Sequence, residues 1–391
     1  MNDTGNPRVA VVHEWLLDYA GSERVLREIL AAFPDADLFA LVDRPNEELL
    51  AEIPRRAKAT TFLQYTPAPG RWLRWTVPLM PLAIRQLDVS GYQIVVTSNH
   101  VVAKGVRTRS DQLHVSYMHT PMRFAWDLQD EYLRAAGLEH GPLAWAAQLV
   151  LHRLRLWDTR TASGVHAFLA NSTHVARRIR KAYGRDAEVL HPPVDVAALR
   201  MEASKEDFYL AVSRLEAYKR NDVLVDAFRA MPGRKLVVIG DGPEKRRLSS
   251  AAPPNVTFRG RLPTPEVHSH MRRARALLFA GIEDFGIVMA ESQACGTPVV
   301  AFADGGALDI VRGENSPRPT GLLFAPQTPQ ALVAAVSRFE ENSARYAPAA
   351  CRENALRFDR SLFRQRFKAI VQAQWQRFCR ELPTEETTKS P

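Results

Sequence analysis

Short apolar runs alternate with amphipathic stretches along most of the chain. In the first half, the runs that we expect to form strands are Val9–His13, Ile94–Ser98, Leu113–Met118 and Ala167–Asn171. In the second half, they are Phe208–Val212, Lys235–Ile239, Asn255–Arg259, Ala276–Ala280 and Pro298–Phe302. Helical stretches lie between most of these runs, and strands that alternate with helices form parallel sheets. The pattern therefore predicts an α/β protein with two Rossmann-like, doubly wound halves.

The length of 391 residues is too great for one ordinary core and also favours two domains. We expect an N-terminal domain, a C-terminal domain, a final helix that packs back on the N-terminal domain, and a disordered tail, over residues 1–195, 196–358, 359–380 and 381–391. Ligands of open parallel sheets bind outside the carboxyl ends of the strands. Two such domains that face each other would hold their ligand in the cleft between them.

Composition favours a soluble protein of a reducing compartment. Hydrophobic residues make up 46% of the chain and charged residues 24%, which excludes disordered and multi-spanning membrane classes. The three cysteines form no CxxC pair, so a disulfide framework or structural zinc site is not expected. The opening residues lack the basic region of a signal peptide, and the longest apolar stretch, Leu143–Leu151, is too short to span a bilayer. We expect a cytoplasmic location.

The formal net charge of +9 is unevenly distributed. The segment Ile53–Leu87 contains no acidic residue, and it mixes aromatic and aliphatic residues with six cations. Such a mixture is typical of segments that bind an anionic membrane surface. Its candidate contact residues are Arg55, Arg56, Lys58, Arg71, Trp72, Arg74 and Trp75. Leu143–Trp157 is a second, weaker candidate, and both segments could instead pack inside the protein; no recognised nucleic-acid motif accompanies them.

The strongest chemical signal is the segment from Glu283 to Glu291, where a strand gives way to a helix. Gly286 permits a ligand to approach the backbone, and the N–H groups of Phe285, Gly286 and Ile287 suit an anion or a sugar oxygen. Glu283 lies just before the helix and Glu291 about one and a half turns inside it, so each carboxylate could hold vicinal hydroxyls. Alternatively, Glu283 only complements the helix dipole and Glu291 is a solvated residue.

Cations and glycine turns follow other strands of the second half. Arg214 and Lys219 come after its first strand and could clamp a diphosphate, although an isolated surface pair would mean little. Gly242 lies in a Gly-Asp-Gly-Pro turn, and the backbone near Leu262 could contact a nucleotide base. The sequence has no Asp-x-Asp motif or clustered metal ligands, so we expect no required metal and no cofactor.

The first half offers similar candidates. We place His13-Glu14-Trp15 and the Ala20-Gly21-Ser22-Glu23 segment in the loop after the first strand, where Gly21 suits a phosphate or a sugar oxygen. His119 and Arg123 follow another strand and could contact a sugar.

With these residues assembled, the chain resembles glycosyltransferase family 4, the retaining enzymes of the GT-B fold. Glu283 and Glu291 form the E-x7-E motif, and Ser-Arg-Leu with Lys219 and the Gly-Asp-Gly-Pro turn reinforce it. The pieces VHEWL, AGSERV and HTPMRFAWD are similar to bacterial mannosyltransferases that use GDP-mannose to build polysaccharide or O-antigen units on a lipid carrier. Ala20 and Ser22 depart from the usual Gly-Gly-Ala, and Asp309 stands in place of the usual Glu.

The resemblance implies a role for each residue. Glu291 would bind ribose, Arg214 and Lys219 the diphosphate, and Glu283 with the backbone of residues 285–287 the donor sugar. Gly21 would face the β-phosphate and His119 the sugar. The residues expected to act in catalysis are Glu283, His119, Arg214 and Lys219. The N-terminal domain would bind the acceptor and the C-terminal domain the nucleotide sugar.

The expected activity is transfer of mannose from GDP-mannose to a hydroxyl of a lipid-linked saccharide, by a protein held peripherally at the cytoplasmic face of the inner membrane. No residue is an obvious covalent nucleophile, which favours a front-face route. Another GDP- or UDP-sugar, such as that of rhamnose, fucose or glucose, is the main alternative. Two other classes are further alternatives. Against a nucleotide-dependent oxidoreductase, the sequence lacks the G-x-G-x-x-G fingerprint. Against a non-catalytic membrane adaptor, it retains the charged residues Arg214, Lys219, Glu283 and Glu291.

Overall fold

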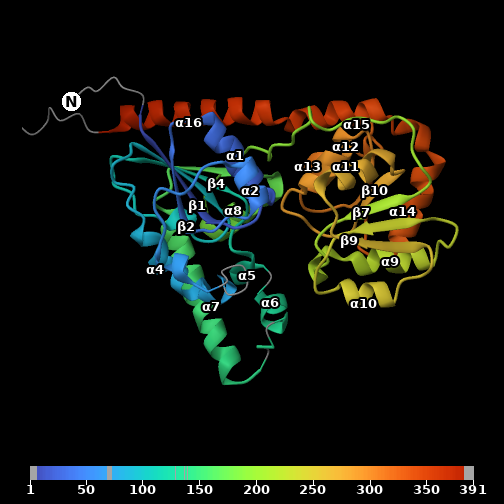
Figure 1. The fold of residues 1–391 in the computed structure, drawn as a ribbon, viewed down its shortest axis with the longest axis horizontal. Helices are drawn as coiled ribbons and strands as arrows, with labels where there is room; N and C mark the ends of the chain where they lie inside the picture. The colour runs from blue at the N-terminus through green and yellow to red at the C-terminus, as the bar shows by residue number, and fades with distance from the viewer. Residues whose placement is uncertain (1–6, 68–72, 128, 136, 139, 383–391) are drawn as a thin grey trace, which may run out of the picture. The chain divides into compact units, whose positions relative to one another are not determined.

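The computed structural model describes residues 7–67, 73–127, 129–135, 137, 138 and 140–382. The chain forms two compact units. Unit 1 comprises the chain as far as Asn171, Val175–His191 and the chain from Phe363 onward, and unit 2 comprises Ser172–His174 and Pro192–Leu362. Each unit is a parallel sheet covered by helices, so the prediction of two Rossmann-like halves is confirmed (Figure 1).

The sheet of unit 1 has the strand order β2-β1-β3-β4-β5-β6, and all its pairs are parallel. Its strands are β1 (Val9–Leu16), β2 (Asp37–Asp43), β3 (Ile94–Asn99), β4 (Leu113–Met118), β5 (Ala167–Ala170) and β6 (Glu188–Val189). The chain leaves β1 toward β2 and later returns to the other side of β1 as β3. The carboxyl ends of β1 and β3 therefore flank the topological switch point, where open sheets bind ligands.

The two faces of this sheet carry different helices. The α-helices of unit 1 are α1 (Gly21–Ala32), α2 (Glu47–Glu52), α4 (Met80–Ala83), α5 (Arg123–Trp126), α6 (Gln129–Ala135), α7 (Pro142–Ala162), α8 (Thr173–Tyr183, whose first two residues belong to unit 2) and most of α16 (Arg360–Glu381). Alternate residues of β1 point to opposite faces, with Val9 and Val11 in one cluster and Ala10 and Val12 in another.

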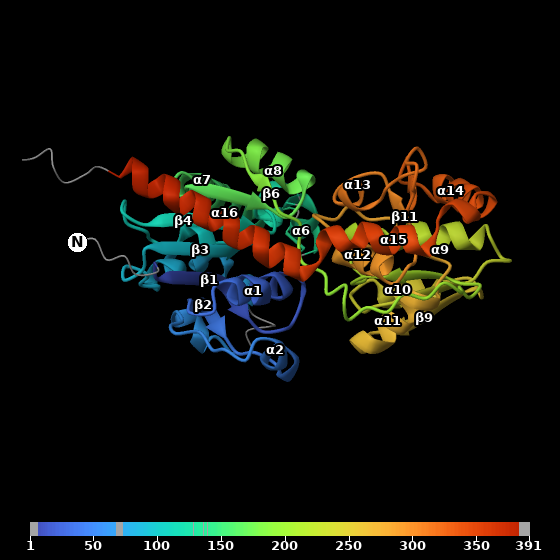
Figure 2. The same cartoon turned by 90° about the horizontal axis from the view of Figure 1, so that it is seen from above.

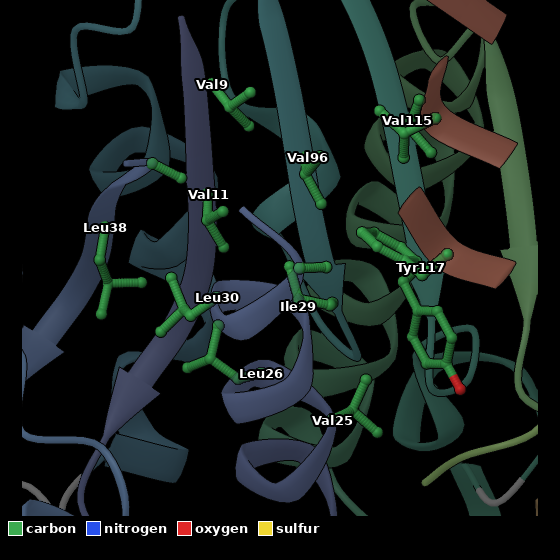
Figure 3. Packing of buried hydrophobic residues seen from close by; sticks show 14 of the residues in the cluster. Val9, Val11, Val25, Leu26, Ile29, Leu30, Leu38, Val96, Val115 and Tyr117 are labelled. Atoms are coloured by element: carbon green, nitrogen blue, oxygen red, sulfur yellow. The ribbon is translucent and has the colours of Figure 1, made fainter. Parts of the chain in front are cut away.

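Helices α1 and α16 cover the first of these faces. Leu26, Ile29 and Leu30 of α1 repeat at helical spacing and pack against Val11 and other strand residues, as Figure 3 shows. Four residues of α16 join the same cluster, namely Phe363, Phe367, Val371 and Phe378. The C-terminal helix is therefore part of the core of unit 1, and Figure 2 shows it running across the sheet.

The sheet of unit 2 has the order β12-β11-β10-β7-β8-β9, and its pairs are also parallel. Its strands are β7 (Tyr209–Val212), β8 (Leu236–Ile239), β9 (Val256–Gly260), β10 (Ala276–Phe279), β11 (Val299–Phe302) and β12 (Gly321–Phe324). Its helices are α9 (Asn221–Arg229), α10 (Lys245–Ser250), α11 (Thr264–Arg273), α12 (Ile287–Ala294), α13 (Ala307–Ile310), α14 (Pro329–Glu341) and α15 (Pro348–Ala355). The switch point of this unit lies between β7 and β10.

Several details differ from the sequence-based expectation. The pattern missed β2, β6 and β12. His13, Glu14 and Trp15 were predicted in a loop, but they lie inside β1, which continues to Leu16. Apolar neighbours on both faces of β1 keep these polar residues in the strand. No helix in the described part of the chain is long and apolar enough to cross a membrane.

Candidate active site

The carboxyl ends of β7 and β10 meet through a pair of opposite charges. Lys219 lies in the loop after β7 and Glu283 in the loop after β10, and the Lys219 ammonium forms an ion pair with the Glu283 carboxylate. The two loops pack closely at Gly281, where a Cβ atom would come within 2.9 Å of the Lys219 carbonyl oxygen. Two predicted residues 64 positions apart are thus brought together at the switch point.

Arg214 occupies the same loop as Lys219 but has a different partner. Its guanidinium donates to the Glu216 carboxylate at 3.0 Å, and its side chain is 77% exposed. An exposed guanidinium on a short intraloop pair can exchange that partner for a phosphate at little cost. The structure therefore leaves Arg214 accessible and holds Lys219 beside Glu283.

The start of α12 supplies the other predicted contacts. Gly286 precedes the helix with φ 93°, a conformation that disfavours other residues, and a Cβ atom there would meet the Met289 methyl group at 2.3 Å. The side chain of Phe285 is buried in the core, so only its backbone could face a ligand. The first N–H groups of a helix have no intrahelical acceptor, and the backbone here suits an anionic or hydroxyl ligand.

Glu291 lies inside α12 and is 8% exposed. The Nε2 atom of His268, on α11, is 3.9 Å from its carboxylate. A carboxylate at this position can accept hydrogen bonds from hydroxyl groups of a ligand as well as from protein donors. The alternative that Glu291 is merely a solvated helix residue is wrong, because the side chain is buried.

The glycine turns around this site mainly allow loops to pack. A Cβ atom at Gly240 would lie 1.8 Å from the Ser213 carbonyl oxygen, and one at Gly242 would lie 2.5 Å from that of Leu215. The Leu215 N–H donates to the Asp241 carbonyl at 2.9 Å. The turn with Gly242 thus supports the loop that carries Arg214 and Lys219.

Two further turns complete this edge of the sheet. A Cβ atom at Gly306 would lie 2.1 Å from the Phe285 carbonyl oxygen, and the Gly306 N–H donates to the Glu283 carbonyl at 2.9 Å. This contact fixes the backbone that leads from Glu283 into α12. Leu262, after β9, is partly buried against the core of the unit.

In unit 1, the carboxyl ends of the strands carry a buried chain of polar side chains. The Glu23 carboxylate, at the start of α1, is 3.2 Å from the His13 Nε2 atom. The His13 Nδ1 atom is 3.1 Å from Ser98 Oγ, which is in turn 2.9 Å from the His119 Nε2 atom. These four residues come from β1, β3, α1 and the residue after β4. Only His119 among them was predicted to face a ligand.

This series of hydrogen bonds determines which nitrogen atoms carry the protons when His13 and His119 are both neutral. The carboxylate accepts from Nε2–H of His13, so Nδ1 of His13 accepts from the Ser98 hydroxyl. Ser98 Oγ then accepts from Nε2–H of His119, whose Nδ1 atom retains a lone pair. Burial lowers the pKa of His119 to about 3, which keeps it neutral. The arrangement presents His119 as a hydrogen-bond acceptor.

A second buried acid, Glu14, anchors this network. One of its oxygens accepts from four successive backbone N–H groups, those of residues 100–103, at 2.9–3.1 Å. The other oxygen is 2.9 Å from the His100 Nδ1 atom. These partners outweigh the effect of burial and lower the pKa of Glu14, while the carboxylate raises that of His100. Glu14 therefore fixes the segment that follows β3.

The other predicted residues that the structure describes in unit 1 lie on separate segments of the chain. Gly21 is the exposed first residue of α1, and Arg123 is the half-buried first residue of α5. In the basic segment, three cations bind within the protein: Arg55 donates to the Pro34 and Ala36 carbonyls, Arg56 pairs with Asp43, and Lys58 pairs with Asp37. These pairs weaken the membrane interpretation for that part of the segment.

Other members of the basic segment differ. Trp75 is 57% exposed, and Leu79 and Leu82 beside it are exposed too. Arg71 and Trp72 lie outside the described residues, as does the side chain of Arg74. In the described part of the chain, no group of three His, Cys, Asp or Glu residues is placed to hold a metal ion.

Sequence reasoning missed the roles of Ser98, Glu23 and His100. Ser98 belongs to an ordinary apolar strand, and its two histidine partners are 85 and 21 positions away. Only the predicted parallel order of the strands could have indicated that these residues share one sheet edge.

Two family models match successive parts of the chain. The model for "Glycosyltransferase Family 4" matches residues 19–198, and the model for "Glycosyl transferases group 1" matches residues 200–358. The boundary between the matches lies close to the boundary between unit 1 and unit 2.

Curated relatives match over a shorter range. A D-inositol 3-phosphate glycosyltransferase of Thermomonospora curvata is 28% identical over 229 residues, which are 49% of this chain and 52% of the relative. Its counterpart in Mycobacterium tuberculosis (strain H37Ra) is 31% identical over 171 residues, 37% of this chain and 35% of the relative. The chain thus spans about half, or less, of the length of these relatives.

Solved structures match the whole fold. Sucrose-phosphate synthase from Thermosynechococcus elongatus has a TM-score of 0.72 at 17% identity, over 95% of this chain and 100% of that one. Anabaena HepE in complex with UDP and glucose has a TM-score of 0.67 at 18% identity, over 94% of this chain and 100% of that one. Together with the two family models, these likenesses support a protein of the GT-B fold that is similar to the glycosyltransferases of family 4.

Proposed function

We propose that the protein is a retaining glycosyltransferase that moves mannose from GDP-mannose to a hydroxyl of a lipid-linked saccharide, in the synthesis of a cell-surface polysaccharide or lipopolysaccharide. The observation that carries the proposal is the arrangement of Lys219, Glu283 and Glu291 at the switch point of unit 2. The chemistry of these residues suits the three parts of a nucleotide sugar. Lys219 suits the diphosphate, Glu283 the hexose hydroxyls and the nearly buried Glu291 the ribose.

Unit 2 supplies the charge stabilisation for the reaction. The bond from the anomeric carbon to the diphosphate breaks, and negative charge develops on the leaving phosphate. Arg214, Lys219 and the start of α12 stabilise that charge through preorganised electrostatics. The acceptor oxygen forms its bond on the same face of the sugar, and a leaving phosphate oxygen takes the acceptor proton. Glu283 holds a sugar hydroxyl once the diphosphate draws Lys219 away from it.

Unit 1 supplies a neutral acceptor group in this scheme. His119 accepts a hydrogen bond from a donor-sugar hydroxyl at Nδ1, because Glu23, His13 and Ser98 hold its proton on Nε2. Gly21 at the start of α1 receives the donor phosphate. No step requires a metal ion or an organic cofactor.

The donor assignment rests on the HTPMRFAWD and VHEWL pieces, which are similar to GDP-mannose enzymes. A UDP-sugar donor is the second candidate, because HepE, a structural neighbour, was crystallised with UDP and glucose. The ribose and diphosphate contacts are common to both donors, so this choice concerns only the base and the sugar.

The acceptor assignment rests on exposed apolar residues in unit 1. Trp75, Leu79 and Leu82 lie in the acid-free segment and would bring the protein to the cytoplasmic face of an anionic membrane, where lipid-linked saccharides are found. Arg123 would contact the acceptor diphosphate.

A transfer assay tests the proposal. The full chain is incubated with labelled GDP-mannose or UDP-glucose and a polyprenyl-diphosphate saccharide in detergent, and the anomeric configuration of the product is determined by NMR. The proposal requires nucleotide release with a retained configuration and loss of transfer in Glu283→Gln. The exposed Glu341→Gln serves as the control, because Glu341 lies on α14, outside this site. Donor binding without transfer, or a trapped glycosyl–enzyme adduct, would contradict it.

A further inference from the structure

The outward face of helix α7 is unusually apolar. Trp145, Leu149 and Leu156 are all exposed, and their spacing of four and seven residues places them on one face. Leu143, in the first turn, is 73% exposed, and Trp145 is 69% exposed. The stripe from Trp145 to Leu156 is about 16 Å long at the rise of an α-helix. Exposed Trp and Leu side chains that share one helix face indicate a binding surface.

The exposed charged side chains of α7 are all basic. No acidic residue occurs between Pro142 and Trp157, whereas Arg153 is exposed and His152 lies beside the apolar stripe. Arg155 is half-buried on the same helix. The first acid, Asp158, is buried and faces the protein interior. The outward face thus combines Trp, Leu and Arg, which is complementary to anionic headgroups above an acyl layer.

The C-terminal half of α7 is firmly anchored. The Asp158 carboxylate is 2.6 Å from the Lys104 ammonium, and it accepts hydrogen bonds from Trp126 Nε1 at 2.9 Å and from the Tyr183 hydroxyl at 2.8 Å. This buried cluster fixes the rotation of the helix about its axis. The apolar stripe therefore cannot turn inward, and Figure 1 shows the N-terminal end of α7 extending beyond the strands of its unit.

Part of the basic segment packs on the same hydrophobic cluster as α7. Leu151 and Trp157 of α7 pack against a cluster that also contains Met80, with Val77 at its edge. Val77 and Met80 lie between Trp75 and Leu82, whose side chains are exposed. Helix α7 and the Trp75–Leu82 segment therefore share one hydrophobic cluster of unit 1.

We infer that α7 docks on an anionic phospholipid bilayer, with the Trp145–Leu149–Leu156 face in the headgroup layer and Arg153 at the lipid phosphates. The inference extends the proposed function, since a membrane-held unit 1 would meet a lipid-linked acceptor. It rests on α7 itself and not on the donor chemistry of unit 2, so the two can be tested separately.

Vesicle sedimentation of the full chain tests the inference. Vesicles of phosphatidylglycerol and phosphatidylcholine are compared with vesicles of phosphatidylcholine alone. We expect binding to the anionic vesicles that is weakened by salt. Trp145→Glu/Leu149→Glu should bind about a hundredfold more weakly, because each large apolar side chain contributes roughly a factor of ten. Leu308→Glu/Leu356→Glu, at exposed leucines of unit 2, should bind like the wild type.

Two further measurements keep the interpretation unambiguous. Circular dichroism melting of both double variants must match the wild type, which shows that each is folded, and their nucleotide binding should be unchanged. Equal vesicle binding by the α7 variant and the wild type would overturn the inference. So would a wild-type dimer in lipid-free sedimentation equilibrium that the α7 substitutions dissociate, because the face would then bind a second copy. If the wild-type protein bound no nucleotide at all, that result would instead contradict the proposed function.

Discussion

The two units position their candidate functional groups at the carboxyl ends of their strands in different ways. In unit 2, the functional groups lie on short loops that glycine turns hold in place, and Arg214 and Lys219 are close in sequence. In unit 1, buried side chains from three elements, linked by hydrogen bonds, position a single group, His119. The arrangement in unit 2 leaves Arg214 accessible to a charged ligand and holds Lys219 beside Glu283, whereas the arrangement in unit 1 controls the position of one proton. Substitutions in unit 2 should therefore impair ligand chemistry alone, whereas those in unit 1 should also affect stability.

The largest expected effect is on turnover in unit 2. Lys219→Met removes a cation from the developing phosphate charge, so kcat should fall about a hundred- to thousandfold. Steady-state kinetics with the donor measures the change, and the melting temperature should stay close to that of the wild type. Lys235→Met, at an exposed lysine just before β8, is the matched control.

A second variant separates charge loss from the effect on Glu283. Lys219→Met leaves that carboxylate without its ion-pair partner. Lys219→Met/Glu283→Gln removes both charges and should be no more active than Lys219→Met. Recovery of kcat in the double variant would show that Lys219 only neutralises Glu283.

The next effect is on the stability of unit 1. Glu14→Gln removes the charge that binds four backbone N–H groups and His100, and it should lower the free energy of unfolding by about 3 kcal/mol. Urea denaturation measures this loss. Glu47→Gln, at an exposed residue of α2, should change stability little. Equal midpoints for Glu14→Gln and the wild type would remove the distinction between the two units.

A smaller effect should follow from disrupting the hydrogen bonds that link Glu23 through His13 and Ser98 to His119. Ser98→Ala leaves the His119 Nε2 atom without its partner, so the tautomer is no longer fixed. We expect kcat to fall about tenfold. Nitrogen-15 NMR of histidine-labelled protein should show mixed tautomers at His119. Ser116→Ala, at a buried serine of neighbouring β4, should leave both the tautomer and kcat unchanged.

The last prediction concerns the dependence of stability on pH. Burial lowers the pKa of His114 and His119 to about 3, so between about pH 3 and 6.5 the unfolded chain binds more protons than the folded one. Stability should rise with pH across this window. The lowered pKa of Glu14 causes a further loss of stability as the pH falls below 4.5. The raised pKa of His100 has the opposite sign, so the stability that His100 contributes is lost as the pH rises through its pKa in the folded protein.

Urea midpoints at several values between pH 4 and 6.5 measure this dependence. His114→Gln should reduce the slope against pH, because His114 is fully buried and takes up a proton only on unfolding. An unchanged slope in this variant would place the acid sensitivity elsewhere.

The sequence predicted what local patterns encode. The apolar runs of β3, β4 and β10 and the turn at Gly286 were found because spacing and glycine placement act within a few residues. The fold class followed from the alternation of these elements. The strands β2 and β12 were missed because nothing in their local pattern separated them from neighbouring apolar stretches.

Long-range contacts limited how much of the candidate site could be predicted from the sequence. The pairing of Lys219 with Glu283 could be expected from the order of strands, since both follow strands that flank one switch point. The partners of Ser98 could not be expected, because His13 and His119 reach it only through the register of β1, β3 and β4. His13 and Glu14 were misplaced in a loop since polar residues inside a buried strand have no local signature.

The central claim is that Glu291 and its neighbours bind a nucleotide sugar, and isothermal titration calorimetry tests it most directly. GDP, GDP-mannose, UDP, UDP-glucose and NAD are titrated into the wild type and Glu291→Ala, with Glu341→Ala as the exposed control. We predict binding of GDP and GDP-mannose that weakens about a hundredfold in Glu291→Ala and stays intact in the control. Binding of UDP ligands alone would overturn the mannosyl donor, and binding that is unaffected by Glu291→Ala, or binding of NAD alone, would contradict the site.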